Sequence, residues 1–308
     1  MRAAFVQTLA ELASQDPRIL LLTGDLGYMA VEPFAEKHPS RFFNVGVAEQ
    51  NMIGVATGLA EAGFIPFVYS IVPFAVLRPY EFIRNGPIQH RWPVRIVGVG
   101  GGFDYGTNGL SHYGLEDIAV MRAQPGIQVI APADAQQTRT ALLRAWNLPG
   151  PVYLRIGKDD RPIVPGLGGK FELGRLQSLS EGSEVLIVAM GSVAMEAEAA
   201  TQALREKNVS CGLAILAHLN PAPVEHLATL LANVPLVLTV EAHYCTGGAG
   251  SLVAEVIAER GLRCRLVRCG VRELPEAISG SARFHHQKHG LGAEQLVETA
   301  LQSLGRTS

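Results

Sequence analysis

A single carboxylate, that of Glu49, opens the apolar and glycine-rich segment FFNVGVAEQNMIGVATGLAEAG (residues 42–63). It is the only acidic residue between Glu36 and Glu61. A carboxylate in such surroundings costs free energy unless it is paired with a positive charge or its proton is used in chemistry. Glu49 is therefore either a first-turn acid that favours a helix N-terminus or the acid of a catalytic site.

The pattern of residues 47–62 predicts a helix that begins near Glu49. Gly54 and Gly58 are four residues apart, so they share one face of this helix. A face of such small residues permits another helix to approach closely.

Four other stretches carry side chains that could do chemistry. GLSHYG holds His112 in a glycine-rich loop, where a histidine is either a surface residue or a group that transfers protons. TGDLG holds Asp25, which is either the cap of a strand-to-helix turn or part of a site. RIGKDD places Arg155 and Lys158 where they could hold an anion.

The fourth stretch, VPFAVLRPYEF, has large side chains at three-residue spacing: Phe74, Leu77 and Tyr80. Such spacing is typical of a helix core.

Composition narrows the classes of protein. The 308 residues are 48% hydrophobic and 18% charged, with a net charge of −2. We therefore expect no nucleic-acid partner and, since no apolar stretch approaches about 18 residues, no membrane partner. The four cysteines have no CxxC spacing and indicate core thiols of a cytoplasmic protein. Residues 1–19 predict an amphipathic helix without a secretory signal.

Short β-branched runs alternate with helical patterns along the whole chain, which predicts an α/β fold. Asp134 is a candidate N-cap for one of these helices. We predict a domain over residues 1–160, a glycine- and proline-rich linker over 161–177 and a smaller α/β domain over 178–308.

Several of these stretches, taken in order, resemble one family. NVGVAEQNMIGVATGLAEAGFIPF, LLTGDLG, GTNGLSHYGLEDIAVMRAQPGIQVIAPADAQQT, GPVYLRIGK and VEAHYCTGGAGSLVAEV are similar to segments of the thiamine-diphosphate enzymes of the transketolase superfamily. The resemblance implies two three-layer α/β/α domains. The first would be a pyrimidine-binding domain with a parallel sheet, and the second a transketolase C-terminal domain with a smaller mixed sheet.

The resemblance also implies roles for single residues. Glu49 matches the glutamate that shares a proton with the cofactor's pyrimidine and so activates it. Phe74, Leu77 and Tyr80 match the family's aromatic floor, with leucine in place of the middle aromatic. His112 matches a histidine near the reacting carbons.

Other family positions point to the cofactor region and the substrate. Asp25 matches an acid that helps to hold the cofactor region together. Asn108 replaces an acid that contacts a sugar hydroxyl, and a second sugar contact, a histidine, falls near Gly100. Lys158, with Arg155 nearby, stands where the family grips phosphate, so sugars or sugar phosphates are the expected substrates.

The family's diphosphate-binding and Mg²⁺-binding signature, G-D-G followed by an asparagine, does not occur at the expected spacing. We therefore expect the C-terminal subunit of a split transketolase. An N-terminal partner subunit would hold Mg²⁺ and the diphosphate of thiamine diphosphate, in an α₂β₂ heterotetramer with homodimer contacts.

Two alternatives stay open. One is the β subunit of a 2-oxoacid dehydrogenase or a decarboxylating enzyme similar to deoxyxylulose-phosphate synthase. The other, of a different class, is a non-catalytic regulatory subunit.

Overall fold

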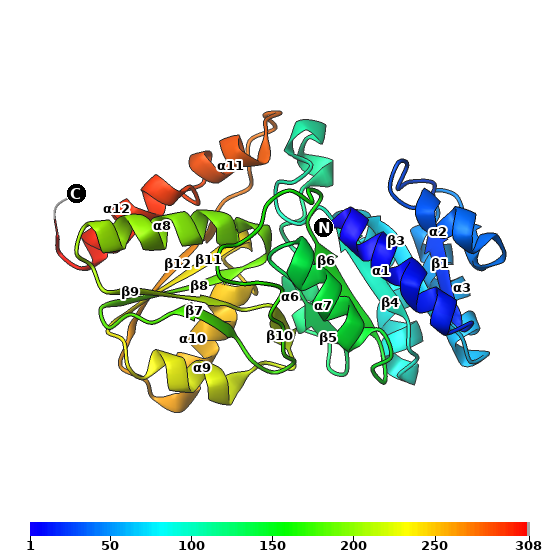
Figure 1. Cartoon of the computed structure of the whole chain (residues 1–308), viewed down its shortest axis with the longest axis horizontal. Coiled ribbons are helices and arrows are strands. Elements are labelled where there is room, and N and C mark those ends of the chain that lie inside the picture. Colours follow the sequence, from blue (N-terminus) through cyan, green and yellow to red (C-terminus); the bar gives the residue numbers. More distant parts are fainter. Residues whose placement is uncertain (307–308) are drawn as a thin grey trace.

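The computed structural model describes residues 1–306 and shows two α/β units side by side (Figure 1). The first unit is built on a seven-stranded sheet. Its strands are β1 (Ile19–Thr23), β2 (Phe42–Asn44), β3 (Ile65–Ile71), β4 (Arg95–Val99), β5 (Gln128–Ile130), β6 (Val152–Ile156) and β10 (His218–Asn220). They are ordered β10-β5-β6-β4-β3-β1-β2, and every pairing is parallel except that of β10 with β5.

The second unit is built on a smaller, mixed sheet. Its strands are β7 (Gln177–Ser180), β8 (Val185–Met190), β9 (Cys211–Ile215), β11 (Leu236–Tyr244) and β12 (Arg265–Val271). They are ordered β12-β11-β8-β9-β7, with β7 antiparallel to β9. The predicted α/β class, with one largely parallel and one mixed sheet, is thus confirmed.

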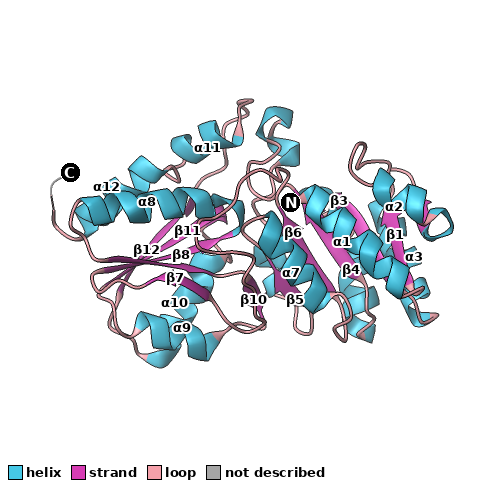
Figure 2. Cartoon of the chain, viewed as in Figure 1, coloured by secondary structure: helices cyan, strands magenta, loops and turns pink. Residues whose placement is uncertain are grey.

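Helices cover both faces of each sheet (Figure 2). The helices of the first unit are α1 (Arg2–Gln15), α2 (Glu32–Lys37), α3 (Glu49–Glu61), α4 (Val72–Val76), α5 (Tyr80–Ile83), α6 (Asp117–Arg122) and α7 (Ala135–Ala145). Those of the second unit are α8 (Ala194–Glu206), α9 (Val224–Leu231), α10 (Ala249–Arg260), α11 (Ala282–Lys288) and α12 (Ala293–Ser303).

The apolar cores follow these layers. One core lies under α1 and α7 and continues under α8 and α12, whereas the other joins α3, α4 and α6 with α9 and α10. Local sequence explains several boundaries. The N-cap of α7 is Asp134 as predicted, since its carboxylate accepts a hydrogen bond of 2.8 Å from the amide of Gln137.

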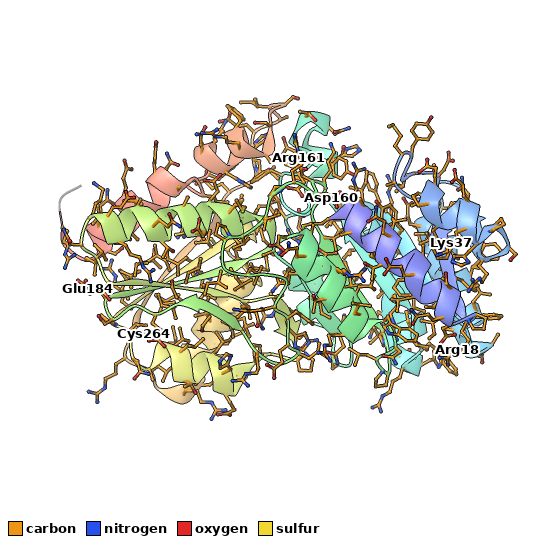
Figure 3. All side chains as sticks on the ribbon, in the orientation of Figure 1. Arg18, Lys37, Asp160, Arg161, Glu184 and Cys264 are labelled. Carbon is orange, nitrogen blue, oxygen red and sulfur yellow. The ribbon has the colours of Figure 1, made fainter. Side chains whose placement is uncertain are left out.

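The end of the first unit is held against its own first helix, and the second unit follows directly. Asp160 lies beside the start of α1 (Figure 3), and its carboxylate accepts hydrogen bonds from the amides of Ala3 and Ala4. After the following loop the chain enters β7, whose first residue, Gln177, is the last residue of the predicted linker. β10 lies in the predicted second domain but extends the first sheet, so the units share a sheet edge. No helix within residues 1–306 is both long and apolar enough to cross a membrane.

Candidate active site

The candidate residues gather at one edge of the first sheet because parallel strands end there together. Lys158 follows β6, His112 follows β4, Phe74 follows β3, Asp25 follows β1 and Glu49 follows β2. These five strands are neighbours in the sheet, in that order. Ligand sites of open α/β sheets form outside such carboxyl ends.

Glu49 is the first residue of α3, and only 2% of its surface is exposed. Its carboxylate is paired with Arg78, whose Nη1 lies 3.1 Å from Oε1 and 3.0 Å from Oε2. Gly24, at the end of β1, borders this carboxylate, since a Cβ there would lie 3.7 Å from Oε1. The buried acid of the apolar helix therefore faces a cation.

Phe74 connects this ion pair to His112. The Cζ atom of Arg78 lies 3.9 Å from the centroid of the Phe74 ring, a cation–π contact. The His112 ring packs edge to face on Phe74 with centroids 5.1 Å apart. Burial and the charge of Arg78 lower the pKa of His112, so its ring is neutral at neutral pH.

Tyr105 extends the row toward Lys158. Its ring lies 6.3 Å from that of His112, and the Lys158 ammonium lies 4.5 Å above the tyrosine ring centroid. Tyr105 also explains Gly100, where a Cβ would come within 2.2 Å of the tyrosine ring. Tyr105 thus fills the space beside the position where the family places a histidine.

We call the contiguous set Glu49, Arg78, Phe74, His112, Tyr105 and Lys158 the site row. Arg78 and Tyr105 were not predicted from the sequence, although Arg78 stands within VPFAVLRPYEF and Tyr105 directly precedes GTNGLSHYG. Their residue types carry no family signal there, and only the fold brings them between the other members.

Five of the predicted residues lie outside the row: Tyr80, Leu77, Asn108, Asp25 and Arg155. The Tyr80 hydroxyl donates to the carbonyl of Val120 at 3.0 Å, which ties α5 to α6. Leu77 is 40% exposed on the surface next to Arg78. Asn108 is exposed in a single 3₁₀ turn (Gly106–Asn108). Asp25 caps no helix, because its exposed carboxylate accepts a 2.9 Å hydrogen bond from the Asn44 side chain on β2.

Arg155 is buried and has structural partners. Its Nε donates to Asp117 at 2.9 Å, and its Nη2 donates to the carbonyls of Gly114 and Ala242 at 2.8 and 2.9 Å. Ala242 belongs to β11 of the second unit, so Arg155 joins the two units. This set of hydrogen bonds favours a structural role over the anion-binding role that its position suggested.

Two family models match the chain in succession. The model described as transketolase, pyrimidine binding domain matches residues 1–162, and that described as transketolase, C-terminal domain matches residues 174–296. The chain belongs to the transketolase family.

Transketolase subunits that are separate chains match it over nearly their full length. An apulose-4-phosphate transketolase subunit of Phocaeicola vulgatus is 33% identical, with 98% of this chain and 96% of that protein covered. A 6-deoxy-6-sulfo-D-fructose transketolase subunit of Clostridium sp. is 33% identical, with 97% and 93% covered. A solved split-gene transketolase, described as an inactive β4 tetramer, has a TM-score of 0.90 and 35% identity, with 100% and 99% covered.

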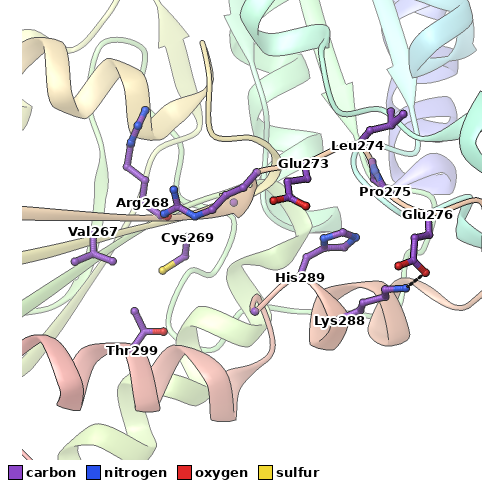
Figure 4. A pocket seen from close by; sticks show the side chains of 13 residues that line it. Val267, Arg268, Cys269, Glu273, Leu274, Pro275, Glu276, Lys288, His289 and Thr299 are labelled. Atoms are coloured by element: carbon purple, nitrogen blue, oxygen red, sulfur yellow. Dashed lines mark hydrogen bonds and ion pairs between the residues drawn. The ribbon is translucent and has the colours of Figure 1, made fainter.

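A cavity of about 530 Å³, separate from the site row, lies in the second unit of this transketolase-family chain. It is found between β12 and the helices α11 and α12 (Figure 4). Lys288 and Glu276 form an ion pair of 2.8 Å at its rim. No member of the site row lines it.

The sequence of the RFHHQKHG segment (residues 283–290), with three histidines and no acid or cysteine at ligand spacing, predicts a solvated loop, and this prediction is wrong. It lies mostly in α11, where His285 and His286 are buried. The rings of His285 and His289 stack on Phe103 at 4.8 and 5.0 Å. In the described part of the chain, no three His, Cys, Asp or Glu side chains are grouped to hold a metal ion.

Proposed function

We propose that this chain is the cofactor-activating subunit of a two-chain transketolase that transfers a two-carbon ketol unit from an anionic ketose to an aldose. The observation that carries the proposal is the site row. A buried glutamate, an aromatic face and a neutral histidine are connected through Arg78 and Phe74 at the carboxyl ends of the strands of the first sheet.

The chain's residues fit the pyrimidine end of that cofactor. When bound, thiamine diphosphate supplies the carbon that takes up the ketol unit. Arg78 serves as a stand-in, because its planar guanidinium both contacts the carboxylate of Glu49 and stacks on Phe74. A planar, nitrogen-rich group is therefore accommodated between these two side chains.

Glu49 would hold the proton that it shares with the pyrimidine nitrogen N1′. Its burial in an apolar helix start keeps that proton from water. His112 has Nδ1 3.0 Å from the Ser111 hydroxyl, and Nε2 makes no hydrogen bond within residues 1–306. A neutral imidazole with a free nitrogen can donate or accept a proton near neutral pH.

The substrate end of the site supports an anionic ketose. The names of both relatives above include an anionic group, phosphate in one and sulfo in the other. Lys158 brings a positive charge to the far end of the row, and its ammonium has no ion-pair partner among the described residues. Because Asn108 and Gly100 replace two family sugar contacts, we propose a ketose that differs from the common transketolase donors near these hydroxyl groups.

A partner subunit would complete the site, with Mg²⁺ and the diphosphate held mainly on its side, in an α₂β₂ assembly. The face of α3 that carries small residues supports this, since Gly54 and Gly58 are both exposed and Gly54 borders a cavity of about 330 Å³. Val55 and Phe82 on the same surface are 41% and 45% exposed. Apolar surface of this kind is typical of a protein interface.

The proposal is tested by reconstitution. The chain is co-expressed with a candidate diphosphate-binding subunit and assayed with thiamine diphosphate and Mg²⁺. We expect aldose-dependent cleavage of a phosphorylated or sulfonated ketose. Turnover of pyruvate or another 2-oxoacid in place of ketoses would favour the dehydrogenase or synthase alternative, and full activity of the partner alone would favour a regulatory subunit.

A further inference from the structure

Arg78 occupies the place where the proposed function puts the cofactor's pyrimidine ring. Its Nη1 lies across both oxygens of Glu49, at 3.1 and 3.0 Å. Its Cζ lies 3.9 Å from the centroid of Phe74. The same two side chains are the acid and the stacking face that the cofactor needs.

The guanidinium of Arg78 and the pyrimidine ring of the cofactor cannot occupy this place at the same time. At 3.9 Å the guanidinium is in van der Waals contact with the Phe74 ring, so no second flat group fits between them. Both carboxylate oxygens of Glu49 already accept from Arg78.

The surroundings of Arg78 allow its side chain to move away from Glu49. Its side chain is 42% exposed, and it stands in the short connection between α4 and α5. Its guanidinium makes no hydrogen bond in the described chain other than those to Glu49. Arg155, by contrast, is 3% exposed and is fixed by hydrogen bonds to three different residues.

Arg78 also stabilises the site while no cofactor is bound. Glu49 is buried, and a buried carboxylate without a partner is costly. The guanidinium neutralises it for as long as the cofactor is away. A charged, planar side chain that stacks on an aromatic ring meets this need better than lysine can.

We propose that Arg78 is a displaceable placeholder of the pyrimidine site, which must swing toward solvent before thiamine diphosphate can bind to Glu49 and Phe74. The inference rests on the proposed function. It makes the affinity for the cofactor depend on the fraction of molecules in which Arg78 is out.

Arginine labelling of the wild-type complex tests this directly. The chain, assembled with its diphosphate-binding partner, is treated with phenylglyoxal with and without thiamine diphosphate and Mg²⁺, and modification of each arginine is followed by mass spectrometry. We expect the cofactor to increase the labelling rate of Arg78 roughly threefold or more, since it releases the side chain. Arg84, an exposed arginine on the adjoining helical turn, is the internal control and keeps its rate. Unchanged or slower labelling of Arg78 overturns the placeholder role.

Cofactor affinity, measured by isothermal titration calorimetry of the same complex, gives a second and independent readout. We expect Arg78→Met to bind thiamine diphosphate about fivefold more tightly than wild type, and Arg78→Lys to fall between them. Arg84→Met removes the same charge and is expected to bind as wild type does. A residue that merely supports the site predicts the reverse order, with wild type tightest, and that result overturns the inference. Arg78→Lys keeps a charge beside Glu49, so the order remains measurable if Arg78→Met does not fold.

These outcomes separate the inference from the proposed function. Cofactor binding by wild type that Arg78→Met does not strengthen overturns only the placeholder role. Absence of cofactor binding by every variant overturns the proposed function, and the inference with it.

Discussion

The rings of Phe74 and His112 pack edge to face with centroids 5.1 Å apart, although one follows β3 and the other follows β4. This contact places the stacking face of the proposed cofactor site beside the group proposed to transfer protons. Arg78 and Glu49 continue the row on one side, and Tyr105 and Lys158 continue it on the other. The members of the site row therefore follow one another in the same order as the strands that they follow in the sheet.

The far end of the row predicts how the substrate anion is held. Replacing Lys158 with Met is expected to raise KM for a phosphorylated or sulfonated ketose roughly tenfold, since a charge-assisted contact contributes about 1.5 kcal/mol or more. KM for the uncharged ketose of the same carbon skeleton should change little. Steady-state kinetics of the reconstituted complex check this, and an equal loss with both substrates would show that Lys158 does not read the anion.

The face of α3 predicts how the partner docks. Gly58 has open space where a Cβ would be, so Gly58→Leu should leave the free chain folded. At a packed interface the added volume is expected to cost roughly 1–3 kcal/mol and to weaken assembly about 10–100-fold. Gly58→Ala is the milder step of the same series. Sedimentation velocity with the partner measures the effect, and assembly that tolerates leucine would place the interface elsewhere.

Removal of the Arg155 side chain, which joins the two units, is predicted to cause a large loss of stability. Arg155→Met leaves Asp117 buried without its cation, which is expected to lower the free energy of unfolding by about 3–5 kcal/mol. Arg139→Met, which removes an exposed ion pair with Glu11, should cost less than about 1 kcal/mol and serves as the control. Urea unfolding of the isolated chain compares the two. Similar small losses for both would mean that Arg155 does not join the units.

Buried histidines predict a loss of stability in acid. Burial lowers the pKa of His218, His243 and His286 to about 4 each. Between pH 6.5 and about 4 the unfolded chain therefore binds protons that the folded chain does not bind. The free energy of unfolding falls as the pH drops through this range. Burial raises the pKa of Glu241 to about 7 and also raises the pKa of Asp104 and of Glu116, which acts in the opposite direction. Burial lowers the pKa of four further histidines, His112, His226, His285 and His289, which adds to the loss in acid.

The expected slope is about 1.4 kcal/mol per pH unit for each net proton. Urea unfolding at pH 7.5, 6.5 and 5.5 measures it, and His286→Leu should flatten the dependence by about one proton. A free energy of unfolding that is level or rises toward pH 5 would contradict this assignment.

Features encoded locally could be predicted from the sequence. The long apolar strands, the start of α3 at Glu49 and the N-cap at Asp134 depend on neighbouring residues, and all are present. The three-residue strand β10 could not be predicted from its own residues, because it forms by pairing with β5 of the other unit.

Features that depend on distant partners could not be predicted. The histidine-rich segment was read as exposed because Phe103, on which His285 and His289 stack, belongs to the first unit. Arg155 matched an anion-binding position, yet its donors are taken by Asp117 and by carbonyls from both units. Residue type and spacing identify the histidine-rich segment and Arg155 as candidates. Only the packed fold shows which of their atoms already have partners.

The central claim, that Glu49 activates the cofactor of a ketol-transfer enzyme, is tested most directly by Glu49→Gln in the reconstituted complex. Glutamine keeps the size of the side chain but cannot share a proton in the same way. We expect kcat for ketol transfer to fall roughly 10²–10⁴-fold, with assembly unchanged by sedimentation. Glu61→Gln, at the exposed end of the same helix, should leave kcat as it is. A fall of less than about tenfold for Glu49→Gln would contradict the account.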